Sequence, residues 1–205
     1  YSLVKGKQEK FGYQIGIRAE YTDREITSVN FDKNTKINRL DWFPTLHLSY
    51  QLPNDHQLLI NYTRRIQRPR SYYLEPFITW QNAYSVYSGN PNLLPEYIDA
   101  IELNWIKTLP NQKGFVSVET YMRHVNNFIS RIQVPYDTNM LMTTPVNVGQ
   151  TYTIGMEPSL NYNLKKWWKI DVAFNLYSYT IESAHEQLRS SHNFNWNSRL
   201  TNTFP

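Results

Sequence analysis

The chain has 205 residues, a formal net charge of +4 at pH 7 and no cysteine. The absence of cysteine excludes both a disulfide framework and a thiolate metal site. The modest positive charge forms no basic stripe, which argues against nucleic acid as a partner. Mean hydropathy is −0.59 although 40% of the residues are hydrophobic, and no apolar run approaches the roughly 18 residues of a transmembrane helix.

The first long segment, Gly12 to Thr22, has the periodicity of a β-strand. One face carries Tyr13, Ile15, Ile17, Ala19 and Tyr21, and the other carries Gln14, Arg18, Glu20 and Thr22. A period of two is typical of a strand, whereas a helix would need 3.6. A sheet whose faces differ this much separates two unlike solvents. The pattern returns along the chain and predicts about eight strands, at 11–26, 40–52, 57–68, 96–108, 115–131, 149–164, 168–181 and 192–204.

The connections between these strands alternate in length. Short turns are predicted at 53–56, 109–114 and 165–167, and long connections at 27–39, 69–95, 132–148 and 182–191. Tight turns at one end and long loops at the other are typical of a bacterial outer-membrane barrel. We therefore predict an all-β fold, an antiparallel transmembrane β-barrel segment. Residues 1–4 resemble the tail of a strand and a further turn is expected at 204–205, so residues 1–205 are expected to form one partial barrel domain.

The second predicted strand indicates what each face would contact. Its apolar set is Leu40, Trp42, Pro44, Leu46, Leu48, Tyr50 and Leu52, and its polar set is Asp41, Thr45, His47, Ser49 and Gln51. The apolar set fits lipid and the polar set fits a water-filled interior. Phe43 falls on the polar face, against the pattern. Asp99 and Lys107 share an apolar face in their strand and are expected near the interfaces. Pro44 and Pro158 are expected at bulges or strand ends, because proline lacks a ladder donor.

Residues 88–97 read SGNPNLLPEY and lead from a long aromatic loop into a strand. This stretch resembles a GNPxLxPE signature of the C-terminal barrel halves of TonB-dependent outer-membrane receptors, and especially of the outer-membrane β-barrel family related to them. Residues 62–69 (YTRRIQRP), 121–129 (YMRHVNNFI) and 202–205 (NTFP) are similar to that family as well. From the residues themselves, Gly89, Pro91 and Pro95 indicate a structural corner rather than a ligand contact.

The resemblance implies a barrel of about 22 strands around an N-terminal plug, with neither the plug nor a signal peptide in this chain. It implies part of a receptor that binds and imports an extracellular solute across the bacterial cell outer membrane, with no catalysis and no cofactor. The implied partners are outer-membrane lipid and lipopolysaccharide, the solute, and the energy-coupling TonB complex through the missing plug. The identity of the solute, and whether a surface lipoprotein caps the mouth, stay open.

The long loop between Arg68 and Pro95 is the expected ligand-binding segment. Its candidate residues are Arg68, Arg70, Tyr72, Tyr73, Phe77, Trp80, Tyr84 and Tyr87. Aromatic rings at an extracellular mouth can stack on sugars, chelate aromatics or peptide side chains, or else pack the loop on itself or reach the lipid interface. Together with Arg64 and Arg65, the two arginines could contact lipopolysaccharide phosphates or an anionic substrate. The alternative is a solvated rim, partly paired with Glu75 and Glu96.

Catalysis and metal binding have no support in the sequence. There is no nucleophile elbow or phosphate-binding glycine loop, and the histidines lack metal-ligand spacing. Two rival functions stay open. The first is an outer-membrane channel without a plug, or a wall component of an export or assembly complex, which a plug domain upstream would disfavour. The second is a soluble carbohydrate-binding β-sandwich, which would be extracted without detergent.

Overall fold

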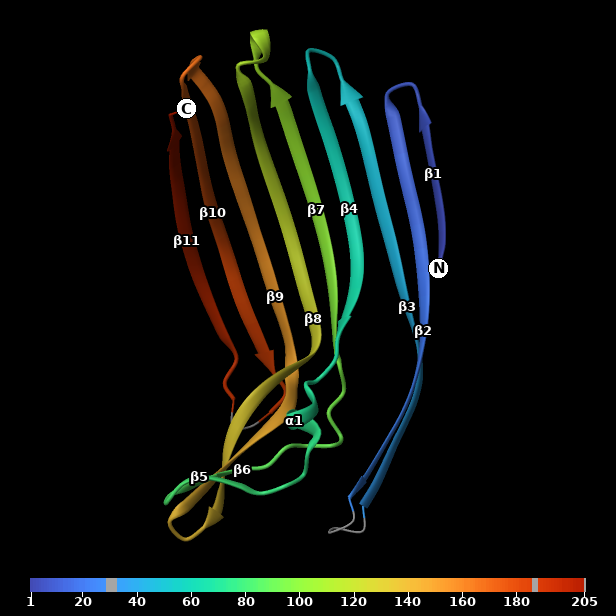
Figure 1. Ribbon diagram of the computed structural model, residues 1–205, viewed down its shortest axis with the longest axis vertical. Helices are drawn as coiled ribbons and strands as arrows, with labels where there is room; N and C mark the ends of the chain where they lie inside the picture. The colour runs from blue at the N-terminus through green and yellow to red at the C-terminus, as the bar shows by residue number, and fades with distance from the viewer. Residues whose placement is uncertain (29–32, 186–187, 205) are drawn as a thin grey trace.

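The computed structural model describes residues 1–28, 33–185 and 188–204. Long antiparallel strands stand side by side in one open, curved wall (Figure 1). In chain order and in spatial order the wall strands are β1 Ser2–Gln8, β2 Phe11–Ser28, β3 Lys33–Leu52, β4 His56–Gln67, β7 Glu96–Thr108, β8 Gly114–Asp137, β9 Met140–Lys165, β10 Trp168–Ser183 and β11 Ser191–Thr203. Between β4 and β7 lie the helix α1 Ser71–Leu74 and the short strands β5 Thr79–Asn82 and β6 Ser85–Tyr87.

Every predicted strand is present, and β1 adds one more to the wall. The predicted long connection at 132–148 is wrong, because β8 and β9 continue as a paired hairpin to Asp137 and from Met140. The connection predicted at 27–39 is also too long, since β2 reaches Ser28 and β3 begins at Lys33; its residues 29–32 lie outside the described residues. Residues 33–39 lack a consistently apolar face. In the other stretch, Ile132, Val134 and Tyr136 alternate with Gln133 and Asp137, so the period of a strand is present there although a loop was predicted.

The predicted short turns lie together at one end of the wall, the upper end in Figure 1, and the longer loops lie at the other. Leu52 pairs with His56 across a three-residue turn, in which Asn54 and Asp55 have φ of 58° and 59°, a left-handed geometry that Asn and Asp tolerate. A 3₁₀ turn, η1 Pro110–Gln112, joins β7 to β8. The predicted layout of an antiparallel meander is therefore confirmed.

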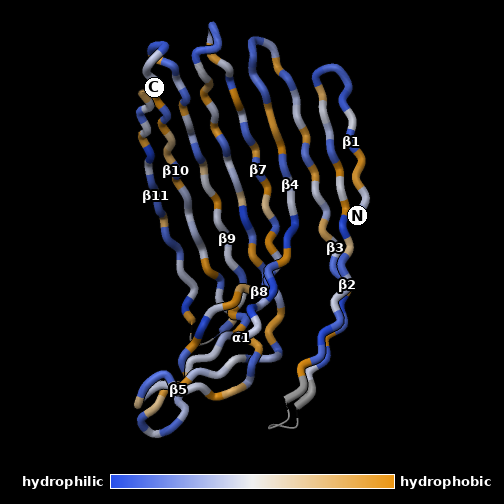
Figure 2. The backbone as a smooth tube through the Cα atoms, viewed as in Figure 1, coloured by the Kyte–Doolittle hydropathy of each residue, from blue (hydrophilic) through white to orange (hydrophobic). Residues whose placement is uncertain are grey.

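The wall is one layer thick, and its two faces differ as the alternation predicts. Along the strands the hydropathy alternates from residue to residue (Figure 2). The side chains of Ile15 and Ile154 are 52% and 57% exposed on the apolar face, which they would not be against a second layer. In the described part of the chain, no helix is long and apolar enough to cross a membrane.

Three residues do not fit the expected strand pattern: Pro44 and Pro158 lack a backbone donor, and Phe43 is an apolar residue on the polar face. Each has a local explanation. Pro44 lies one residue beyond the last β3–β4 pair, Thr45 with Thr63, and Pro158 lies in a gap of the β9–β10 ladder, so neither has to donate there. Phe43 is only 2% exposed, beneath the guanidinium of Arg18 at 4.8 Å.

The two charged residues on the apolar face of β7 lie at opposite ends of it. Asp99 accepts a hydrogen bond from the hydroxyl of Tyr62 (2.8 Å) near the loop end, and Lys107 pairs with His56 at the turn end. Both residues lie toward the ends of the strand, and their position near the membrane interfaces stays a prediction.

Apart from Phe43 in the wall, a group of buried aliphatic residues lies beyond the wall, at the loop end. They are Leu74, Val86, Leu93, Ile132 and Val148, each 9% exposed or less. They come from α1, β6, the residues before β7, and the ends of β8 and β9 nearest the loops. This small core fixes the long loop on residues 128–148 of β8 and β9, here named the β8–β9 extension.

Candidate functional site

Residues 88–97, the corner, tie the long loop to the β8–β9 extension. The backbone N–H of Gly89 donates to the carbonyl of Glu75 (3.0 Å), and that of Asn90 to the carbonyl of Tyr73 (2.6 Å). A Cβ on Gly89 would lie 2.5 Å from the Glu75 carbonyl oxygen, which is why the position needs glycine. The Asn90 side chain donates to the carbonyl of Pro145 (3.3 Å).

The end of the corner is fastened by polar side chains. The carboxylate of Glu96, 6% exposed, accepts a hydrogen bond from the backbone N–H of Ile129 (2.7 Å). The backbone pairing of β7 with β8 does not reach Ile129, because it ends at the pair of Tyr97 and Asn126. The Asn147 side chain donates to the carbonyls of Leu94 and Asn127, at 3.0 and 2.7 Å. These contacts are those of a structural corner, as the prolines and glycine predict.

A cleft forms where this loop meets the β8–β9 extension. The Arg131 guanidinium lies 6.0, 5.3 and 6.0 Å from the ring centroids of Tyr72, Tyr73 and Tyr87 and donates to the Tyr72 hydroxyl (2.6 Å). The Tyr72 ring meets that of Tyr73 edge-on at 4.5 Å. We name this arrangement the Arg131 cleft; it encloses 310 Å³, with Phe77 and Glu75 on its wall.

Strand pairing holds the Arg131 cleft in shape. β5 pairs with β6, and β6 pairs in parallel with β9 through Ser85 with Leu141 and Tyr87 with Thr143. Burial raises the pKa of the Tyr87 hydroxyl. A hydrogen bond with Tyr72 lowers the pKa of Tyr73, and Arg131 adds to that effect. The cleft therefore combines one cation with three phenol rings, and the pKa values of the Tyr73 and Tyr87 hydroxyls are shifted in opposite directions.

The predicted site residues divide into three groups. Tyr72, Phe77 and Tyr87 line the Arg131 cleft, and Tyr73 contacts the Arg131 guanidinium beside it. Trp80 and Tyr84 lie in and beside the β5–β6 hairpin, 65% and 72% exposed. Arg68 and Arg70 do not line the cleft. Arg131 was not among the site residues predicted from the sequence. Arg131 is the last residue of the predicted strand at 115–131, and there it resembles any other polar strand residue.

The arginine cluster does not pair as expected. Arg68 bonds Glu20 of β2 at 2.6 Å, and Arg64 lies 3.9 Å from Asp99. The expected pairing with Glu75 and Glu96 is therefore wrong for these two arginines, because β2 and β7 bring other carboxylates closer. Contact of the cluster with phosphates or an anionic solute stays a prediction.

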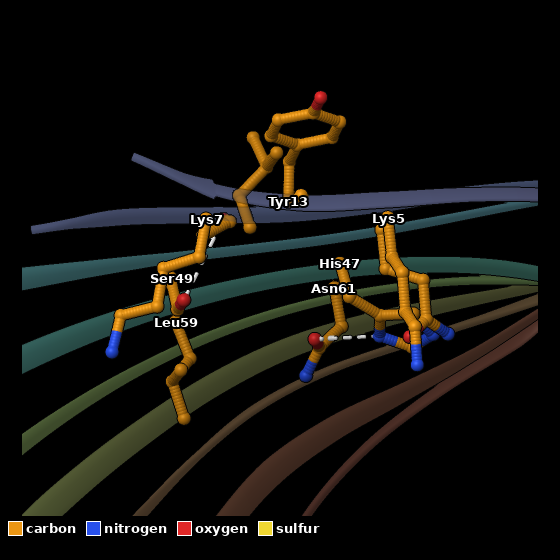
Figure 3. A pocket seen from close by; sticks show the side chains of 11 residues that line it. Lys5, Lys7, Tyr13, His47, Ser49, Leu59 and Asn61 are labelled. Atoms are coloured by element: carbon orange, nitrogen blue, oxygen red, sulfur yellow. Dashed lines mark hydrogen bonds between the residues drawn. The ribbon is translucent and has the colours of Figure 1, made fainter. Parts of the chain in front are cut away.

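A second hollow, of 540 Å³, lies on the polar face near the turn end. Lys5, Lys7, His47 and Asn61 lie on one side of the strands and Tyr13 on the other (Figure 3). His47 and Asn61 share a hydrogen bond of 3.0 Å. Within the described ranges, no group of three or more His, Asp or Glu residues could hold a metal ion, so this hollow offers a polar surface rather than a metal centre.

The chain was compared with known protein families and with curated proteins. The model of the outer membrane protein beta-barrel family matches residues 1–205, the whole chain. A search of curated proteins finds no match.

Three solved structures are similar to the chain. The ferric enterobactin receptor PfeA of Pseudomonas aeruginosa has a TM-score of 0.62 at 16% identity, over 87% of this chain and 29% of PfeA. The Serratia marcescens hemophore receptor HasR, solved with its hemophore and heme, has 0.59 at 15%, over 83% and 32%. The copper transporter OprC has 0.59 at 12%, over 93% and 38%. The chain thus spans less than two fifths of the length of each, and the likeness shows the fold.

Proposed function

The chain belongs to the outer membrane protein beta-barrel family and lies in the bacterial outer membrane, and we propose that it is the barrel wall of a TonB-dependent receptor that captures and imports an extracellular solute. The apolar face then contacts lipid and the polar face lines the passage. The remaining strands, a plug and its energy-coupling motif would come from other parts of the receptor.

The observation that carries this proposal is the Arg131 cleft at the loop end of the wall. Its tyrosines present ring faces and hydroxyls, and Arg131 presents a fixed cation. Such a set suits a solute with a planar or sugar ring bearing an acceptor group, since aromatic rings stack and guanidinium bonds acceptors in a fork. The small core beneath the loop keeps the cleft in one conformation before the solute binds, so less conformational entropy is lost on binding.

The similar structures support the same role. They are a receptor for ferric enterobactin, a receptor for a hemophore, and a copper transporter. A wall of the same fold with an aromatic, cationic cleft at its loop end fits a receptor better than a channel without a plug, which needs no shaped capture site. The outer-membrane assignment disfavours the soluble β-sandwich.

The experiment measures binding to the full-length receptor in detergent, with ferric enterobactin, heme, Cu²⁺ and maltohexaose as probes. For any probe that the wild type binds, Arg131→Gln and Tyr87→Ala should each weaken binding about tenfold or more, the loss of one charge-assisted hydrogen bond or one stacked ring. Tyr50→Ala, an exposed tyrosine at the turn end, is the matched control. Unchanged affinity in both cleft variants would remove the cleft from the capture site.

Conductance separates the receptor from the channel. In a planar bilayer a full-length receptor whose lumen is plugged should stay closed to ions, whereas a channel without a plug conducts continuously. Steady conductance by the full-length protein would show that it is a channel without a plug.

A further inference from the structure

The wall divides along its length between β3 and β4. Their backbone pairing ends at Thr45 with Thr63, although β3 continues to Lys33 and stays paired with β2. Residues 17–28 and 33–44, here named the β2–β3 arm, form a two-stranded ribbon that stands apart from the neighbouring strands (Figure 1). Side chains, rather than a backbone ladder, connect the described part of the arm to the rest of the wall.

Two carboxylates of the arm, Glu20 and Asp41, take part in these connections through Arg68 and Tyr97, and each also contacts an arginine within the arm. Glu20 and Asp41 lie directly opposite each other on one face of the arm, an unfavourable like-charge pair. Arg18 and Arg68 contact Glu20 at 3.1 and 2.6 Å. Arg39 contacts Asp41 at 2.8 Å, and Asp41 also accepts from the hydroxyl of Tyr97.

Arg24 lies on the same face but has no such partner. Among the described residues, no carboxylate lies within 4.0 Å of its guanidinium, which donates only a long bond of 3.4 Å to the carbonyl of Leu93. Its Nε is buried and makes no hydrogen bond. Arg39 is its diagonal neighbour, because Thr22 pairs with Arg39 and Arg24 with Ile37. Of these two neighbouring guanidiniums, only that of Arg39 contacts a carboxylate, Asp41, and Arg24 carries an unsatisfied buried donor.

A buried donor without a partner is costly and is rare in folded proteins. We propose that Arg24 and Arg39 form a binding site for the carboxylate or phosphate group of a diffusible anion, held between the β2–β3 arm and the corner. Guanidinium groups receive such oxygens through two parallel hydrogen bonds. The anion would supply the acceptor that Arg24 lacks and balance the excess of positive charge. The site shares no residue with the Arg131 cleft and does not depend on the proposed transport.

The test uses inorganic phosphate and the full-length receptor in detergent at constant ionic strength, with ³¹P line broadening as the readout. Arg24→Gln should weaken phosphate binding about tenfold or more, and Arg24→Lys should retain part of it, since a point charge replaces the fork. Arg199→Gln, an exposed arginine of β11, should bind as the wild type does. Equal binding by Arg24→Gln and wild type, or no binding by wild type, would overturn the proposal.

Ile37→Glu provides a second, independent variant. Ile37 lies directly opposite Arg24, so a glutamate there places a carboxylate in the site from within the chain. It should abolish phosphate binding while raising the thermal unfolding midpoint, a combination that a misfolded variant cannot give. A lowered midpoint together with normal phosphate binding would contradict the site.

Discussion

Replacement of Glu96 by alanine should loosen the β8–β9 extension without unfolding the wall. The Glu96 carboxylate is 6% exposed and is the acceptor for the backbone N–H of Ile129 at 2.7 Å. Leaving a buried donor unsatisfied costs about 1–3 kcal/mol. Since 1.36 kcal/mol is a factor of ten, amide exchange in the extension should accelerate between about fivefold and about 150-fold.

The assay is hydrogen exchange by mass spectrometry on peptides that cover 128–148, with peptides from β10 as the internal reference. Glu96→Gln keeps an acceptor oxygen at the same place and should recover most of the protection. Exchange in Glu96→Ala equal to wild type, or Glu96→Gln as fast as Glu96→Ala, would refute the role given to this hydrogen bond.

Further substitutions probe the core, the corner and the two faces of the wall. Leu93→Ala, at a fully buried site, should cost about 2–5 kcal/mol and speed proteolysis within 68–95 while β10 stays protected; uniform protection would contradict it. Gly89→Ala should open the same segment, because its Cβ would lie 2.5 Å from the Glu75 carbonyl, and wild-type protease resistance would show that the corner can shift. Trp196→Arg, on the apolar face, should destabilise the folded receptor in lipid vesicles by about 2–4 kcal/mol, whereas Asn197→Arg beside it should be nearly neutral. Equal urea midpoints for these two variants would show that the faces are not distinguished by lipid.

The wall could be predicted from the sequence because lipid imposes a period of two on each strand. The alternation of Trp42 with Asp41, and of Ile154 with Thr153, can be recognised in a single strand without knowing its neighbours. The pattern fails where that solvent contrast ends. In residues 132–148, Ile132 and Val134 still alternate with Gln133, but Leu141, Thr144 and Pro145 fall on the wrong faces for a strict alternation, so a paired hairpin was predicted as a loop.

The site was harder to predict because it depends on register between distant strands. The aromatic loop drew attention to Tyr72, Tyr73 and Tyr87, but Arg131 joins them only through the pairing of β6 with β9. The sequence likewise placed Arg68 with its neighbours in the loop, whereas the arm brings Glu20 to it. No local signal reports contacts across 48 residues of chain.

The most direct test of the account measures which solvent each face of the wall contacts. Because the chain has no cysteine, single cysteines can be placed along β9 from 152 to 160 in the full-length receptor, spin-labelled and reconstituted in lipid vesicles. The apolar face at Ile154 and Met156 should be accessible to oxygen, and the polar face at Thr153 and Glu157 to a water-soluble nickel reagent, with a period of two. Equal access to the nickel reagent at all positions would contradict a lipid-facing wall.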